Sequence, residues 1–151
     1  MEERQTSEPF EVDQRLTAHG TYWAGKMGSR FYAALRDEQK ILGSPCPTCR
    51  KVFWPPRSVC TFCFSELQDV VEIGPLGTVE TFTLVTYAEP VHPRPAPFVY
   101  AVIRLDGAST GMAHFLDEVD PDTIHIGMRV RPVFAEQRQG NILDILYFKP
   151  L

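Results

Sequence analysis

The chain lacks any run of apolar residues that approaches the roughly 18–20 a membrane helix needs. Its first eight residues are acidic and contain no apolar stretch, which argues against a signal peptide or an N-terminal anchor. Cysteine is scarce, with four in 151 residues. These features favour the cytoplasm, a reducing compartment in which paired cysteines usually bind a metal and do not form disulfides.

Recognisable catalytic motifs are also missing. The sequence contains neither Gly-x-Ser-x-Gly nor a glycine-rich phosphate loop. An acidic cluster at residues 117–122 matches no EF-hand loop. The histidines have no metal-ligand spacing to one another, and we expect the one inside a strand, His114, to be a structural barrel residue. They are His19, His92, His114 and His125. We therefore expect no catalytic residues in this chain.

The four cysteines form two C-x-x-C pairs separated by ten residues. Two such turns can face each other around one tetrahedral metal, the arrangement of a zinc ribbon. Zinc is the expected ion, although tetrahedral sulfur also suits iron. A site with four thiolate ligands has no open coordination position, so the metal is expected to be structural. The expected ligands are Cys46, Cys49, Cys60 and Cys63.

Two aromatic residues and two prolines join the pairs. Phe53 and Trp54 are expected to shield the metal, and Pro55 and Pro56 to stiffen the turn. Residues 51–59 are expected to form two short strands.

The net charge of −4 is unevenly distributed. Residues 26–65 have a net charge of +5, whereas residues 66–151 have a net charge of −6. The basic segment suits an anion such as a phosphate, or an acidic partner surface. An ordinary solvated surface is the alternative. The basic residues nearest the cysteines are Arg50, Lys51 and Arg57.

Residues 21–40 are expected to form a helix, because apolar side chains recur there every four residues. Two glycines, Gly25 and Gly28, weaken this helix locally. The apolar stripe can lie in the chain's own core or form a partner interface, and the sequence leaves both open. It consists of Trp23, Met27, Phe31 and Leu35.

From residue 77 onward the pattern changes to strands, expected at 78–87, 98–105, 111–116, 128–135 and 142–148. A short helical turn is expected at 117–125, with Pro121 in its first turn. This order is typical of an OB-fold, a five-stranded Greek-key barrel. The fold class is thus mainly β with an N-terminal helix, a rubredoxin-like zinc ribbon and a five-stranded OB-fold barrel. The expected divisions are a flexible arm (1–20), helix and ribbon (21–67), linker (68–76) and OB-fold domain (77–151).

Such a module has two candidate functions, as a non-catalytic subunit of an enzyme or as a binder of single-stranded nucleic acid. Nucleic-acid binding needs a basic groove with exposed aromatic residues. The acidic balance of the barrel half makes this the weaker of the two.

A resemblance to a known family rests on several short matches. They are Cys46, Cys49, Pro55-Pro56-Arg57, Cys60, Cys63, Gly77-Thr78-Val79, the strand Phe98–Val102, and Ile126–Val130. In this combination, over about residues 20–150, the chain resembles the acyl-CoA-associated proteins that join a rubredoxin-like zinc ribbon to an OB-fold. One departure is Arg50, which stands where rubredoxin-like knuckles usually have glycine, so a left-handed backbone there is costly.

The resemblance implies a role in a hetero-oligomer. Members of the family commonly accompany thiolase-like enzymes, whose own chain holds the catalytic cysteine and histidines. The zinc-ribbon chain assists assembly or acyl-CoA binding, and Arg50, Lys51 and Arg57 are then candidates for contact with CoA phosphates. Residues 24–32 and 40–43 are similar to the small subunit of 2-benzoylsuccinyl-CoA thiolase and its relatives in anaerobic aromatic degradation.

Overall fold

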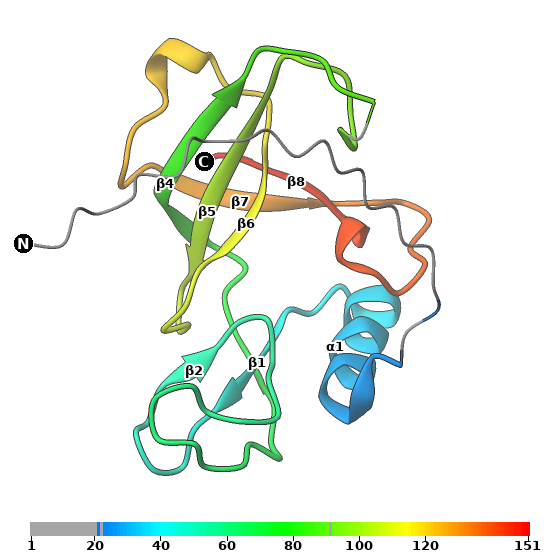
Figure 1. Ribbon diagram of the computed structural model, residues 1–151, viewed down its shortest axis with the longest axis vertical. Helices are drawn as coiled ribbons and strands as arrows, with labels where there is room; N and C mark the ends of the chain where they lie inside the picture. Colours follow the sequence, from blue (N-terminus) through cyan, green and yellow to red (C-terminus); the bar gives the residue numbers. More distant parts are fainter. Residues whose placement is uncertain (1–20, 22, 91) are drawn as a thin grey trace, which may run out of the picture.

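The computed structural model describes residues 21, 23–90 and 92–151. The flexible arm expected at residues 1–20 lies outside these residues. A helix and a small ribbon lie at one end of the molecule and a β-barrel lies at the other (Figure 1). None of the helices in the described part of the chain has the length and apolar run that a bilayer crossing needs.

Helix α1 (Gly25–Glu38) is shorter than the expected helix of residues 21–40. It ends at Gln39, whose left-handed backbone (φ 56°) lets its N–H bond to the Ala34 carbonyl. The helix buries one face. The burial of the residues on that face shows which members of the apolar stripe lie in the core. Met27, Phe31 and Leu35 are buried in the chain's own core. Trp23 precedes the helix and is 99% exposed, so among the stripe residues the interface interpretation survives for Trp23 alone.

The ribbon is a three-stranded antiparallel sheet in the order β2-β1-β3. Strand β1 (Leu42–Pro45) pairs on one side with β2 (Val52–Phe53). On the other side it pairs with β3 (Val71–Glu72), so the expected linker of residues 68–76 contains a strand. The expectation of two strands within residues 51–59 was wrong, because β2 pairs with the strand that precedes the first cysteine pair.

The barrel is closed, with strand order β4-β5-β6-β8-β7. All five expected strands are present, which confirms the predicted architecture. Their bounds are β4 (Gly77–Val85), β5 (Phe98–Leu105), β6 (Met112–Leu116), β7 (Arg129–Phe134) and β8 (Ile145–Pro150). Strand β8 begins later than expected, because residues 142–144 form a 3-10 turn (η2). The helical turn between β6 and β7 is η1 (Pro121–Thr123), with Pro121 in its first turn as predicted.

The turn between β5 and β6 attaches the ribbon to the barrel. Ser109 donates its N–H to the Val52 carbonyl (2.7 Å), and its hydroxyl accepts the Val52 N–H (3.1 Å). The Thr110 hydroxyl bonds both the N–H and the carbonyl of Trp54, at 2.9 and 3.0 Å. These bonds extend the edge of β2 onto the barrel and hold Trp54 in place.

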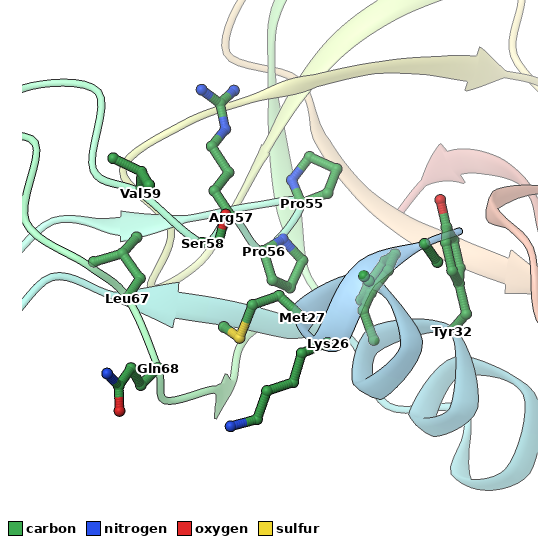
Figure 2. A pocket seen from close by; sticks show the side chains of 14 residues that line it. Lys26, Met27, Tyr32, Pro55, Pro56, Arg57, Ser58, Val59, Leu67 and Gln68 are labelled. Carbon is green, nitrogen blue, oxygen red and sulfur yellow. The ribbon is translucent and has the colours of Figure 1, made fainter. Parts of the chain in front are cut away.

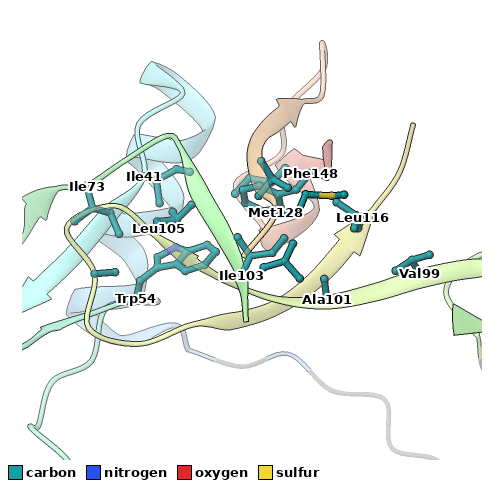
Figure 3. Packing of buried hydrophobic residues seen from close by; sticks show 14 of the residues in the cluster. Ile41, Trp54, Ile73, Val99, Ala101, Ile103, Leu105, Leu116, Met128 and Phe148 are labelled. Atoms are coloured by element: carbon teal, nitrogen blue, oxygen red, sulfur yellow. The ribbon is translucent and has the colours of Figure 1, made fainter. Parts of the chain in front are cut away.

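Trp54 is completely buried, and it does not shield the metal site as expected. Its ring packs in the main core, with Leu105 and Ile103 of β5 beside it (Figure 3). It also meets the ring of Phe148 on β8 edge-on, at 6.2 Å between centroids. Phe53 is the last residue of β2 and faces the cysteines, whereas Trp54, directly after it, faces the barrel.

The loop between β7 and β8 holds helix α1 against the barrel. The Arg138 guanidinium donates to the Arg36 carbonyl (2.7 Å), near the C-terminal end of the helix. The buried Asp144 carboxylate shapes this loop by accepting the backbone N–H groups of Gln139 (2.8 Å) and Gly140 (2.7 Å). The buried apolar residues of the helix, the ribbon and the barrel also form one main core.

Burial of Phe31 yields a stability prediction. Phe31→Ala leaves a cavity between α1 and the ribbon and is expected to lower the free energy of unfolding by about 3–5 kcal/mol. Trp23→Ala is the matched control. Its side chain is fully exposed, so a change within about 0.5 kcal/mol is expected. Urea denaturation of both variants measures the difference, and equal stability of the two variants would contradict the burial of Phe31.

Candidate metal centre and adjoining groove

The two cysteine pairs lie on two turns with the same backbone design. In the first turn, the Cys46 N–H donates to the Lys51 carbonyl (2.7 Å) and the Arg50 N–H donates to the Cys46 carbonyl (3.0 Å). In the second, Cys60 bonds Ser65 (2.9 Å) and Phe64 bonds Cys60 (3.0 Å) in the same way. Each turn thereby directs its two sulfur atoms toward the other turn.

Both turns require a left-handed residue directly after the second cysteine. Arg50 has φ 60° and Phe64 has φ 59°, a region that glycine adopts most easily. The sequence indicated this strain at Arg50. The same position in the second turn, occupied by Phe64, was missed, although its place after Cys63 was a sufficient signal.

The sulfur geometry fits a tetrahedral metal. The Sγ atoms of Cys46 and Cys63 are 3.5 Å apart, as are those of Cys49 and Cys60, and all four lie within 4.8 Å of one another. A disulfide has its sulfurs about 2.05 Å apart, so none is formed. Zinc–sulfur bonds of about 2.3 Å in a tetrahedron place the sulfurs about 3.8 Å apart, close to the observed distances. The four cysteines thus form a zinc-ribbon site.

Hydrogen bonds from the turns lower the pKa of two of the thiols. The hydroxyl and the N–H of Ser65 lower the pKa of Cys63 to about 6. Burial raises the pKa of Cys60, but the N–H groups of Cys63 and Phe62 outweigh it, and the net shift is downward. These bonds stabilise thiolates, which are the form that binds metal.

The pKa of the Cys49 thiol is raised, in contrast to those of Cys60 and Cys63. The Lys51 backbone lowers its pKa, but burial and the three neighbouring thiols outweigh this and raise it to about 11. Four thiolates this close repel one another, and a divalent cation at the centre removes that repulsion.

Little apolar surface supports the metal site. Phe53 and Leu67 are the buried side chains that pack against the cysteines in the described residues. A cluster this small supplies little hydrophobic stabilisation, so a bound zinc would replace a core that the ribbon lacks. The zinc would be structural, with all four coordination positions occupied by protein.

Replacing one ligand tests the site. Cys60→Ser is expected to abolish stoichiometric zinc and to leave a ribbon that unfolds locally and aggregates, because three thiolates hold the metal poorly. Elemental analysis and circular dichroism measure both effects. Thr48→Ala removes a neighbouring hydroxyl bond to Ser65 but no ligand, and it is expected to retain one zinc per chain. Wild-type protein purified without chelator that holds no metal would contradict the site.

A groove of about 610 Å³ adjoins the ribbon, between the start of α1 and the turn of residues 55–59. Figure 2 shows Lys26 and Met27 on the helix side and Pro55, Pro56 and Arg57 on the ribbon side. The groove therefore combines an apolar lining with two cationic residues, Lys26 and Arg57.

The three basic residues singled out in the sequence do not converge on one point. Arg57 lines the groove, with its guanidinium 5.7 Å from the centre of the Phe53 ring. Lys51 lies over the exposed Phe62 ring at 4.6 Å, and Arg50 is exposed on the first turn. Lys26 was missed as a groove residue, because nothing in the sequence indicates that the helix start lies opposite Arg57.

His114 has the structural role that was predicted. It is buried in β6, its Nδ1 accepts the Phe115 N–H (2.8 Å), and its Nε2 faces the Ile142 carbonyl (3.4 Å). Burial lowers its pKa, which favours the neutral form of the ring. Of the other histidines, His92 packs between Tyr87 and Phe98, His125 contacts the Thr123 carbonyl, and His19 lies outside the described residues.

Comparison with known proteins agrees with both halves of the structure. The ChsH2 rubredoxin-like zinc ribbon domain matches residues 33–68, and the ChsH2 C-terminal OB-fold domain matches residues 70–135. The chain is similar to DUF35 domain-containing scaffold proteins of two archaea. The Methanocaldococcus jannaschii protein is 27% identical over 83% of this chain and 92% of the relative. The Methanothermobacter thermautotrophicus protein is 28% identical over 80% and 94%.

Two solved structures share the fold. The Ltp2-ChsH2(DUF35) aldolase aligns with a TM-score of 0.59 and 25% identity, over 81% of this chain and 93% of that one. A DUF35 protein of unknown function from Sulfolobus solfataricus aligns with a TM-score of 0.60 and 25% identity, over 72% and 78%. The predicted resemblance is thus confirmed: the chain joins a ChsH2-type rubredoxin-like zinc ribbon domain to a ChsH2-type OB-fold domain, and DUF35 scaffold proteins are its homologues.

Proposed function

We propose that this chain is a non-catalytic scaffold subunit of a thiolase-type enzyme complex that makes or breaks carbon–carbon bonds in acyl-CoA substrates. Its zinc ribbon and OB-fold would support assembly, and its basic groove would help to hold CoA. The complex is proposed to be cytoplasmic, where its thiols stay reduced.

The observation that carries this proposal is the use of every cysteine in one cluster. Thiolase chemistry needs a free, activated cysteine as its nucleophile. All four cysteines of this chain converge on one metal site, which leaves no thiol for such a role. The catalytic cysteine of a thiolase complex would therefore come from a partner chain.

The relatives support a partner role. Two of them are scaffold proteins, and one solved structure is an aldolase that contains a ChsH2(DUF35) component. Thiolases and aldolases both act on carbon–carbon bonds, so such an enzyme is the partner we propose. The similarity to the small subunit of 2-benzoylsuccinyl-CoA thiolase adds an aromatic acyl-CoA as the substrate to test first.

Reconstitution tests the scaffold role. The isolated chain is expected to show no thiolase activity, to copurify with a thiolase-family subunit, and to restore full activity to that subunit. The measurement is the rate of acyl-CoA cleavage by the partner with and without this chain. The Cys60→Ser variant serves as the unfolded-ribbon control. Full activity of the partner alone would remove the scaffold proposal.

The groove is the proposed point of contact with CoA. Lys26 and Arg57 lie on its two sides, and charge-assisted bonds from arginine to phosphate are among the strong hydrogen bonds of proteins. Arg50 and Lys51 remain proposed as secondary contacts on the first turn. The docking of acidic partner residues on the same surface is the competing interpretation.

Charge reversal distinguishes the two interpretations. Arg57→Glu is expected to raise the KM for acyl-CoA by about tenfold or more in the assembled complex, because it replaces an attraction to phosphate with a repulsion. Arg131→Glu makes the same charge change on an exposed site of β7 outside the groove, and an unchanged KM is expected. Steady-state kinetics and gel filtration are run together. An unchanged KM excludes Arg57 from CoA binding, whereas a dissociated complex indicates docking.

Nucleic-acid binding is the second candidate, and one observation favours it. Tyr100 and Phe115 stack at 4.7 Å on the outer face of strands β5 and β6, the face that OB-folds use for bases, and of the two only Tyr100 is partly exposed. The −6 balance of residues 66–151 opposes it, because phosphate backbones need a basic groove. Salt-sensitive binding of single-stranded oligonucleotides would favour this candidate over the scaffold.

A further inference from the structure

Strand β4 is paired on both edges along its first half and on one edge along its second half. Its first residues are enclosed by neighbours on both edges: Gly77 and Thr78 pair with β7, and Val79 exchanges backbone hydrogen bonds with Met128 and Gly127. Beyond Glu80, the strand is paired with β5 alone within the described residues. In an antiparallel pair, every second N–H and C=O then points away from the neighbour, so this half of β4 has an open hydrogen-bonding edge.

Beyond the bulge at residue 80, the open half of β4 has neither lysine nor proline, and no strand of the described residues pairs with its free edge. Residues 81–85 read Thr-Phe-Thr-Leu-Val, without proline or charge. Edge strands in soluble proteins are normally blunted by lysine, proline, a bulge or a covering segment. Two large apolar side chains are instead exposed here, Phe82 at 37% and Leu84 at 42%.

A bulge determines which way these side chains face. The register between β4 and β5 shifts between Val79 and Thr81. Beyond the shift, Phe82 lies opposite Ala101 and Leu84 opposite Val99, and both partners belong to the barrel core. Phe82 and Leu84 are therefore on the inner face of the sheet, at an end where the hairpin of β4 and β5 extends past the barrel (Figure 1).

A hollow of about 200 Å³ lies beside this inner face. Leu84, Val99, Leu116 and Val119 supply its apolar walls, and the ion pair of Arg94 with Asp117 (2.6 Å) lies at its side. An added strand along the β4 edge would therefore find both backbone partners and a place for an inward-pointing apolar side chain.

The loop on the far side of this hollow is acidic. Asp117 and Glu118 are engaged by Arg94 and Lys149. The next acids, Asp120 and Asp122, are exposed and make no ion pair within the described residues. A segment that enters between β4 and this loop meets negative charge, which favours lysine or arginine at its end.

We propose that the open edge of β4, from Glu80 to Val85, is a strand-addition site for an extended segment of the partner enzyme. Backbone hydrogen bonds would supply affinity, and alternate apolar side chains entering the hollow would supply specificity. A basic residue of the same segment would lie beside Asp120 and Asp122. This inference rests on the proposed scaffold function and names the surface through which it acts.

Hydrogen exchange tests the site in the whole complex. The full chain is tagged and purified from its producing cells with the partner enzyme attached. Amide exchange within residues 80–85 is expected to slow at least tenfold in the complex relative to the free chain. Exchange within β8, which is paired in the free chain, is the internal control. A complex that forms without slower exchange at residues 80–85 overturns the strand-addition site and leaves the scaffold function standing, whereas failure of any enzyme to copurify overturns both.

Two lysine variants test whether the inner face of β4 contributes to partner binding in addition to its backbone edge. Leu84→Lys places a charge in the hollow and is expected to weaken the complex by tenfold or more. Thr83→Lys places the same charge on the opposite face of the same strand and is expected to change the affinity by less than threefold. Surface plasmon resonance with the copurified enzyme measures both. Equal effects of the two variants would overturn the role of the hollow.

Other occupants of the edge give distinct results. Protection of residues 80–85 in the free chain that vanishes when residues 1–20 are deleted would assign the edge to this chain's own N-terminal segment. Protection that rises with concentration, together with a dimer in ultracentrifugation, would assign it to a second copy. Either result overturns the proposal of a partner segment.

Discussion

The two neighbouring residues Phe53 and Trp54 connect the metal site to the barrel, and the rest of the structure depends on their opposite orientations. Phe53 packs against the cysteines, and Trp54 enters the main core beside β5 and β8. Each is fully buried, and burial of a large aromatic side chain contributes about 2–3 kcal/mol. Because the two residues are adjacent in the chain, a shift of the ribbon would expose one of the two cores.

Hydrogen bonds around Trp54 fix the orientation of the ribbon relative to the barrel. The Ser109 hydroxyl bonds the backbone of Val52 in β2, and the Thr110 hydroxyl bonds the backbone of Trp54 directly after it. The indole N–H of Trp54 has no hydrogen-bond partner in the described part of the chain, a cost of about 1–3 kcal/mol. Burial of the indole ring, at about 2–3 kcal/mol, offsets this cost.

This attachment suits a scaffold. The groove between α1 and the ribbon lies near one end of the chain's long axis, and the open half of β4 lies near the other (Figure 1). One continuous core connects the parts of the chain that carry the two surfaces. The surface ion pairs, such as Arg104 with Glu80, add little to stability.

The sequence by itself determined the parts of this protein that depend on local spacing. Two C-x-x-C pairs specify a four-sulfur site because each turn places its sulfurs without help from distant residues, and the alternation after residue 77 specifies five strands. It left open what depends on contacts between distant segments. Whether Phe31 lies in a core or at an interface was decided by the packing of α1 against the ribbon, and Trp54 was drawn into the barrel because β5 and β8 supply its apolar neighbours. The inward orientation of Phe82 and Leu84 follows from a bulge after Val79, since one extra residue in a strand reverses the face of every residue beyond it.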